Sequence, residues 1–188
     1  MPGIASQVRQ TAATAVGAWA GLQQASSIGS SMTFRRSVAH TRTMHVDVEV
    51  EAVLPFPCEE VAAYAGDPTN APEWYANIHS VSWQTPPPTA LGSKMDFEAR
   101  FLGRRLAYTY EVVDLEPGRR LVMRTADGPF PMETTYTWEH VAGGTLMKLR
   151  NRGAPSGFAK VAAPMMAKAM KSAMGKDLDR LAHRLASR

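Results

Sequence analysis

The 188-residue chain lacks several residue types and patterns, and each absence limits what the protein can be. Only one cysteine is present, Cys58, so no disulfide can form within the chain and a cysteine-rich metal site is excluded. A single cysteine fits a reducing compartment, and we expect a cytoplasmic protein. No run approaches the roughly 18 apolar residues that a membrane-spanning helix needs, so no transmembrane segment is expected.

The common catalytic motifs are also missing. The five histidines are scattered, and no two of them have the spacing of metal ligands. There is no Gly-x-Ser-x-Gly motif and no glycine-rich loop for a phosphate. We therefore predict no metal, no cofactor and no nucleophilic catalytic residue. Of the histidines, His79 is the one that the order of elements places nearest the mouth of the expected cavity.

Acidic residues are absent from residues 1–46, which carry four arginines, whereas the other 142 residues hold 17 basic and 17 acidic groups. Residues 1–43 are also rich in Ala, Ser, Thr and Gly. This composition predicts a disordered N-terminal extension and a folded domain over residues 44–188. Two alternatives stay open: an organellar transit peptide, or a start-site artefact with Met32 or Met44 as the working start.

The domain begins with a pattern typical of a strand. Val46, Val48 and Val50 alternate with Asp47 and Glu49, so one face is apolar and the other is wet. Two prolines end this strand, and Cys58-Glu59-Glu60 then opens a short helix. A second short helix opens at Pro72-Glu73 and carries Trp74 into the interior.

Strands alone follow, separated by short turns rich in Gly and Pro. The alternation predicts a strand over 78–84, a strand with alternating residues over 94–101, and a long strand with Leu106, Tyr108, Tyr110 and Val112 on one face. Three more strands carry Leu121 and Met123, then Phe130 to Trp138, and finally residues 145–151. Turns as short as Leu102-Gly103 require antiparallel neighbours. We therefore expect an α+β domain in which a curved seven-stranded antiparallel sheet wraps on one long C-terminal helix.

The expected C-terminal helix, within residues 156–188, has two distinct faces. One face carries methionines and then leucines at helical spacing: Met166, Met170, Met174, Leu178, Leu181 and Leu185. The opposite face carries Lys160, Lys168, Lys171, Lys176, Arg180 and Arg184. Methionine side chains adapt to irregular space, which suits a floor that receives different molecules. The basic face predicts at most a weak contact with a membrane surface, and without interleaved aromatics it does not predict nucleic-acid binding.

The inward face of the predicted sheet is strongly aromatic, and it supplies the candidate ligand-binding residues. They are Trp74, Phe97, Phe101, Tyr108, Tyr110, Met123, Phe130, Met132, Thr134, Tyr136 and Trp138, with Met166 and Met170 opposite them. These side chains either fill a solid core or line a pocket whose hydroxyl groups orient an apolar ligand. The carboxylates Asp96, Glu98, Glu111, Glu133 and Glu139 have the opposite parity, so we expect no inward ionisable group.

Several segments together resemble the SRPBCC superfamily, in its START-like, polyketide cyclase/dehydrase-type branch. They are Asp67-Pro68-x-Asn70-x-Pro72-Glu73-Trp74, Phe101-Leu102-Gly103-Arg104-Arg105, Leu115-Glu116-Pro117-Gly118-Arg119-Arg120-Leu121 and the terminal helix with Pro164. The resemblance covers residues 44–186 and implies a helix-grip fold with a cavity between sheet and helix. It does not imply a reaction, because members include both carriers and cyclases.

Two functions are compatible with these observations. The first is binding or transport of a small hydrophobic ligand, which could be a lipid, a sterol-like molecule or an aromatic polyketide-like molecule. The second is a polyketide cyclase, aromatase or dehydratase that acts in the same cavity. An enzyme of this kind needs an inward ionisable group with a displaced pKa. Because the strands offer none, the sequence favours binding.

Overall fold

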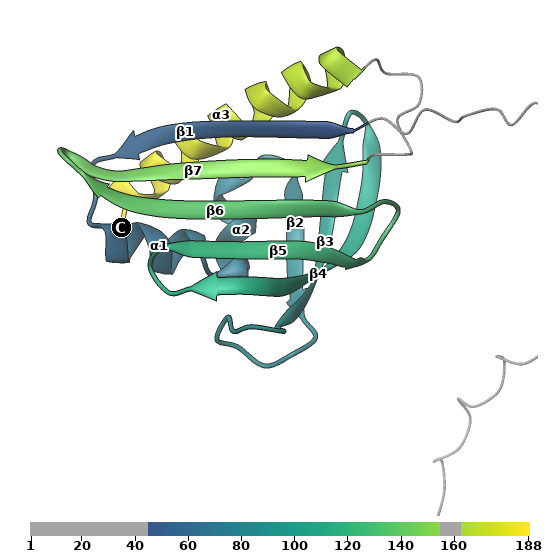
Figure 1. Ribbon diagram of the computed structural model, residues 1–188, viewed down its shortest axis with the longest axis horizontal. Coiled ribbons are helices and arrows are strands. Elements are labelled where there is room, and N and C mark those ends of the chain that lie inside the picture. The colour runs from purple at the N-terminus through teal and green to yellow at the C-terminus, as the bar shows by residue number, and fades with distance from the viewer. Residues whose placement is uncertain (1–44, 155–162) are drawn as a thin grey trace, which may run out of the picture. The chain divides into compact units, whose positions relative to one another are not determined.

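One antiparallel sheet organises the part of the chain that the computed structural model describes, residues 45–154 and 163–188. The strands are β1 (Val46–Leu54), β2 (Ile78–Trp83), β3 (Lys94–Phe101), β4 (Arg104–Glu116), β5 (Arg120–Asp127), β6 (Met132–Val141) and β7 (Gly144–Gly153). Their spatial order is β1-β7-β6-β5-β4-β3-β2 (Figure 1). The predicted seven-stranded antiparallel sheet is confirmed, and the first and last strands are neighbours in it. The prediction for residues 1–43 lies outside the described residues, as does Lys160.

The helices also follow the predicted order. Helix α1 (Cys58–Ala65), the 3₁₀ turn η1 (Pro68–Asn70) and helix α2 (Ala71–Trp74) come after β1, and helix α3 (Ala163–Ala186) ends the chain. The Asp67 side chain accepts a 2.9 Å hydrogen bond from the backbone N–H of Thr69, which caps the turn. Trp74 at the end of α2 is only 1% exposed, so this short segment delivers its indole to the core as expected.

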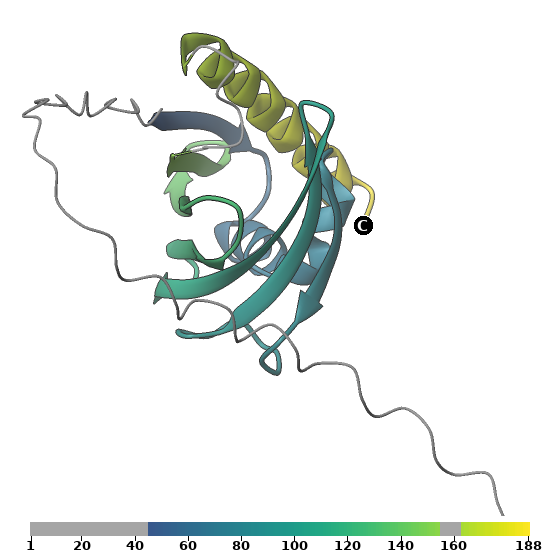
Figure 2. The same ribbon diagram turned by 90° about the vertical axis from the view of Figure 1, so that its right-hand side faces the viewer.

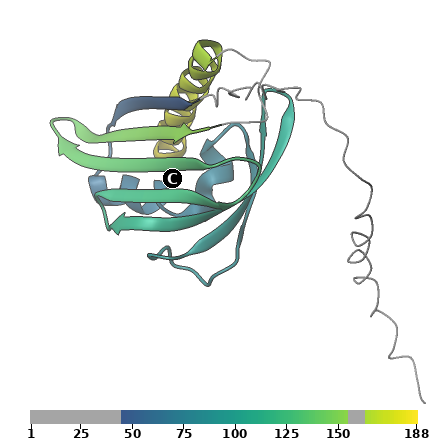
Figure 3. The same ribbon diagram turned by 45° about the vertical axis from the view of Figure 1, so that its right-hand side comes forward.

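The sheet curls, and α3 lies on its concave side (Figures 2 and 3). Helix α3 packs against β1 and α2. Its C-terminal half buries Leu178, Leu181 and Leu185. Arg184 donates a 3.0 Å hydrogen bond from Nε to the carbonyl oxygen of Glu73, so polar contacts reinforce this anchored half.

Two glycines explain how the strands turn so tightly. Leu102 and Gly103, between β3 and β4, have φ values of 47° and 78°, the geometry of a two-residue hairpin turn. Gly144 at the start of β7 has φ of 138°, and a Cβ atom there would overlap the carbonyl oxygen of Leu54. The end of β1 can therefore approach β7 closely only because residue 144 has no side chain.

One strand boundary differs from the sequence prediction. Alternation predicts Phe130 on the same strand as Met132, but β6 begins at Met132. Pro129 and Pro131 flank Phe130 and have no N–H group to donate to a neighbouring strand, so the ladder cannot extend to it. Phe130 nevertheless remains buried.

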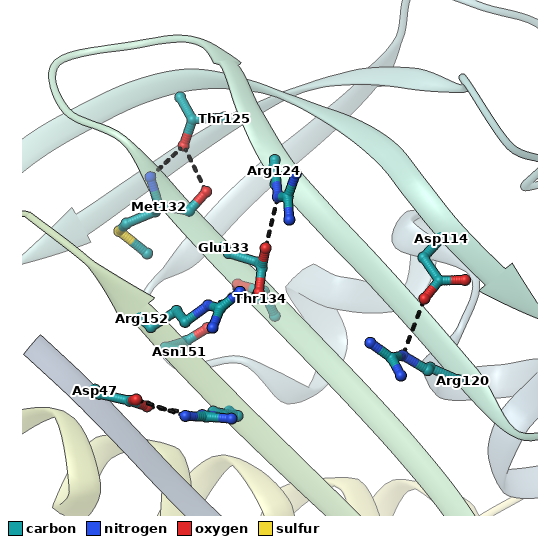
Figure 4. Close-up of polar contacts among 11 residues, drawn as sticks. Asp47, Asp114, Arg120, Arg124, Thr125, Met132, Glu133, Thr134, Asn151 and Arg152 are labelled. Atoms are coloured by element: carbon teal, nitrogen blue, oxygen red, sulfur yellow. Dashed lines mark hydrogen bonds and ion pairs between the residues drawn. The ribbon is translucent and has the colours of Figure 1, made fainter.

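Charged side chains pair with one another across the strands. Glu133 on β6 accepts from Nε of Arg124 at 2.5 Å and from Nε of Arg152 at 2.7 Å, which joins β5, β6 and β7 (Figure 4). Burial would raise the pKa of Glu133, but these two hydrogen bonds outweigh it and lower the pKa. Asp96 accepts from the hydroxyl of Thr109 at 2.6 Å, and this bond lowers its pKa. None of the five strand carboxylates named above lines the cavity described next.

Candidate ligand-binding cavity

A cavity of about 100 Å³ lies between the concave face of the sheet and α3. Its lining is mainly apolar and comes from every strand except β2, from the segments before β2 and before β6, and from α3. The apolar lining residues are Val46, Ala99, Phe101, Leu106, Pro129, Phe130, Met132, Met166, Met170, Ala173 and Met174. Pro129 and Arg152 are the exposed residues of the lining, so they mark the end at which the cavity opens.

Each of the two walls of the cavity, sheet and helix, carries a small side chain. Ala99 on β3 and Ala173 on α3 both line the cavity, and neither can reach across to the other element. Met166, Met170 and Met174 supply the rest of the helical wall. Because an unbranched thioether changes conformation at low cost, this wall can reshape around a guest more easily than one of leucines.

Seven of the thirteen candidate residues line the cavity: Phe101, Tyr108, Tyr110, Phe130, Met132, Met166 and Met170. The other six, Trp74, Phe97, Met123, Thr134, Tyr136 and Trp138, are all buried but do not line it. They form the packed layer around it. Alternation along a strand identifies the inward face, but it does not tell how far from the hollow each inward side chain lies.

Stacked rings hold the aromatic wall in place. The ring of Tyr108 lies parallel to that of Phe97, with centroids 5.5 Å apart and an interplanar angle of 1°. Tyr110 meets Tyr108 edge to face at 4.9 Å. Such ring pairs contribute about 0.5–1.5 kcal/mol each beyond the burial of their area. The sheet side of the cavity is therefore rigid, in contrast to its methionine side.

Hydrogen bonds satisfy several of the polar groups around the cavity. Thr134 donates from its hydroxyl to Oδ1 of Asn151 at 2.6 Å, so the Tyr110 hydroxyl, 3.0 Å away, donates to Thr134. The hydroxyls of Tyr75 and Tyr136 lie 2.8 Å apart. Burial raises the pKa of Tyr110 to about 12, despite its bond to Thr134, and burial raises the pKa of Tyr75 and Tyr136 as well. All three groups are therefore neutral at physiological pH.

Asp177 on α3 is the functional candidate that the sequence prediction missed. It lines the cavity, is 2% exposed, and accepts a 2.9 Å hydrogen bond at Oδ1 from the backbone N–H of Ala76. Burial raises its pKa to about 6, against the opposing effects of the Ala76 bond and of Arg180. The prediction that no ionisable group faces inward is therefore wrong. Its signal is present in the sequence, because residue 177 lies three positions after Met174 and four before Leu181.

A second polar group lies at the same inner end. Asn77, between α2 and β2, lines the cavity, and its Oδ1 atom is buried without a hydrogen-bond donor among the described residues. His79 is exposed and does not line this cavity, so the histidine expected near its mouth is elsewhere. Among the residues described, no three His, Cys, Asp or Glu side chains are grouped so that they could hold a metal ion.

Comparison with known proteins identifies the family of this chain. The model of the family described as polyketide cyclase/dehydrase and lipid transport matches residues 45–186. The chain belongs to this family. A search of curated proteins found no match. No described helix of this polyketide cyclase/dehydrase family member combines the length and the hydropathy that crossing a membrane requires.

Solved structures share the fold of this polyketide cyclase/dehydrase family member at low identity. A protein of Thermus thermophilus is 18% identical, with a TM-score of 0.65 over 75% of this chain and 97% of its own. The Zhui aromatase/cyclase of a Streptomyces species is 16% identical, with a TM-score of 0.61 over 77% and 95%. A START superfamily protein of Mycobacterium smegmatis is 15% identical, with a TM-score of 0.61 over 76% and 97%. The expected helix-grip fold and superfamily are confirmed.

Proposed function

We propose that the protein binds a small hydrophobic molecule, for storage or transport, in the cavity between the sheet and α3. The observation that carries the proposal is the cavity itself, with an apolar lining, a rigid aromatic side, an adaptable methionine side and a few polar groups at one end. This combination is typical of small-molecule sites. Burial of the ligand would drive binding at roughly 25 cal/mol per Å² of apolar surface.

The size of the cavity limits the ligand. Engineered cavities of about 150 Å³ hold a benzene ring, and pockets for drug-sized ligands occupy about 300–1,000 Å³. A cavity of about 100 Å³ is smaller than both, so it suits a short chain as it stands and a single ring once the methionine side chains adjust. A lipid, sterol-like or polyketide-like molecule requires the methionines to move or part of the ligand to protrude between Pro129 and Arg152.

The family description, which includes both cyclisation and lipid transport, supports this class of ligand without choosing within it. The exposed basic face of α3, with Lys168, Lys171 and Lys176, supports weak contact with an anionic membrane from which such a ligand could be taken. The single buried thiol of Cys58 is consistent with a cytoplasmic location.

The proposal is tested with protein purified from its source and kept native. We expect native mass spectrometry to find a retained small molecule, and a fluorescent apolar probe to bind to the emptied protein. Ala173→Leu places bulk in the cavity and should abolish both signals, whereas Ser172→Leu adds similar bulk on the exposed face of the same helix. Absence of any bound molecule and of probe binding would reject the proposal.

Asp177 favours a second candidate, a polyketide cyclase or dehydratase. A buried carboxylate with a pKa of about 6 could take a proton from the methylene between two ketone groups, so that the enolate formed attacks another carbonyl of the same chain. We expect ring products from a synthetic poly-β-keto thioester to form faster with the wild type than with Asp177→Asn. Equal rates, matching the uncatalysed reaction, would reject this candidate.

A further inference from the structure

The polar groups of the cavity are distributed unevenly. Asp177, Asn77 and Tyr75 belong to its inner end, where α3 meets the segment between α2 and β2, and Arg152 belongs to its open end. Arg152 already donates from Nε to Glu133. The inner end therefore carries an acidic group, and the cation of the lining is committed to a carboxylate at the other end.

Asp177 is not fully satisfied by the protein around it. A carboxylate has about four acceptor positions, and the described residues supply one donor, the N–H of Ala76. The hydroxyls of Tyr75 and Tyr136 share one hydrogen bond, which leaves one hydroxyl hydrogen over, but no hydrogen bond joins either of them to Asp177 in the described part of the chain. The hydroxyl of Tyr110 donates to Thr134. Arg180, on the same helix, is exposed and acts on Asp177 through charge without a hydrogen bond between them.

An acceptor that faces an apolar hollow without a donor is costly to keep. Leaving a buried polar group unpaired is destabilising, and more so when the group is charged. Asn77 adds a further buried oxygen without a donor at the same end. Asp177 and Asn77 therefore each have an acceptor position that the described residues do not fill, and a ligand that brings a donor would relieve this penalty on binding.

We propose that Asp177 receives a hydrogen-bond donor of the ligand, so that the cavity selects apolar molecules with a hydroxyl or ammonium group at their buried end. This inference rests on the proposed function and adds the chemistry of the ligand to it. A carboxylate ligand is disfavoured in this orientation, since it would bring a second negative charge beside Asp177 in a region of low polarity. Tyr75 and Tyr136 are neutral, and Arg180, whose charge lowers the pKa of Asp177, is exposed, so no buried cation among the described residues offsets that repulsion.

Three probes with one ring system test the selection. Benzyl alcohol, benzylamine and benzoate are titrated into the full chain at about pH 7.5, with binding measured by calorimetry. We expect the alcohol and the amine to bind at least about tenfold more tightly than the carboxylate, because each brings a donor to a charged acceptor whereas the carboxylate brings a like charge.

Asp177→Asn is the informative variant, because its amide oxygen can still accept from Ala76 while the charge is lost. We expect the amine to lose about tenfold in affinity and the carboxylate to gain. Asp179→Asn, two residues along and exposed, is the matched control and should leave all three affinities unchanged. Thermal unfolding of each variant verifies that it is folded.

The outcomes separate the inference from the proposed function. If the wild type binds the three probes with equal affinity, and Asp177→Asn does the same, the inference is overturned and the cavity is a general apolar site. Preferential binding of the carboxylate, lost in Arg152→Gln, would overturn it by placing recognition at the open end. Binding of none of the probes, together with no effect of Ala173→Leu on the apolar fluorescent probe, would overturn both.

Discussion

The side chain of Asp177 and the backbone of Ala76 are joined by a 2.9 Å hydrogen bond that links residues 101 positions apart. This bond fixes α3 to the segment between α2 and β2 at the inner end of the cavity. It also holds a carboxylate where solvent cannot reach it, and that location has a measurable consequence for stability.

Stability should depend on pH through Asp177. Its pKa in the folded protein is about 6, above its ordinary value of 3.8, so folding is penalised once the group ionises. The contribution of Asp177 to stability therefore falls as the pH rises from about 4 to 6 and stays lower above that. Relative to wild type, Asp177→Asn should gain on the order of 1–3 kcal/mol between about pH 4 and pH 7.

Urea unfolding at several pH values measures this difference. Taking variant minus wild type cancels the titration of all other groups that the substitution leaves alone. Asp179→Asn, on the exposed side of the same helix, provides the reference. A difference between Asp177→Asn and wild type that does not change with pH would contradict the assignment of a buried, ionising carboxyl group.

The pair formed by Tyr75 and Tyr136 should be energetically coupled. Tyr136→Phe removes one hydroxyl and leaves that of Tyr75 without its 2.8 Å partner, which should cost about 1–3 kcal/mol. The double variant with Tyr75→Phe removes both groups and should cost less than the sum of the two single changes. Denaturant unfolding of the four proteins gives the coupling, and strict additivity would show that the two hydroxyls do not interact.

The two halves of α3 should respond differently to truncation. Leu181 is fully buried in the anchored half, so Leu181→Ala should cost about 2–5 kcal/mol of stability. Met170 is partly exposed and borders the cavity, so Met170→Ala should cost less and enlarge the space available to a ligand. Thermal unfolding and a binding series of increasing ligand size test the two effects, and equal losses of stability would contradict the contrast.

Two glycines at turns should differ in their tolerance of alanine. Gly103 has φ of 78° and nothing within 4 Å of an added Cβ, so Gly103→Ala meets only the backbone penalty, about 1–2 kcal/mol. Gly144→Ala would also force a Cβ against the carbonyl of Leu54, and we expect a larger loss. The ranking is measured by thermal unfolding, and a milder effect at Gly144 would refute the close approach of β1 and β7.

Local patterns are sufficient to predict most of the fold. Alternation such as Val46-Asp47-Val48 identifies both a strand and its inward face, and turns such as Leu102-Gly103 leave only an antiparallel arrangement. The start of β6 is predicted two residues too early. Pro129 and Pro131 have no backbone N–H group for strand pairing, and the alternation of side chains carries no information about backbone donors.

The site is predicted less completely, for a geometric reason. Alternation along β4 predicts that Tyr108 and Thr109 lie on opposite faces of the sheet. The curl of the sheet determines that Tyr108 borders the cavity whereas Trp138 is buried away from it. That curl depends on contacts between residues far apart in the chain. Asp177 escapes a search for carboxylates along the strands, although helical spacing places it on the same stripe as Met174.

The uneven composition of α3 has a mechanical consequence. Buried leucines pack the last turns of the helix into the core, whereas the methionines and Ala173 of its first turns border the cavity. The N-terminal half of α3 can therefore move away from the sheet to admit a ligand while its C-terminal half stays packed. Amide hydrogen exchange should then be faster over 166–173 than over 178–185, and a bound guest should narrow that gap.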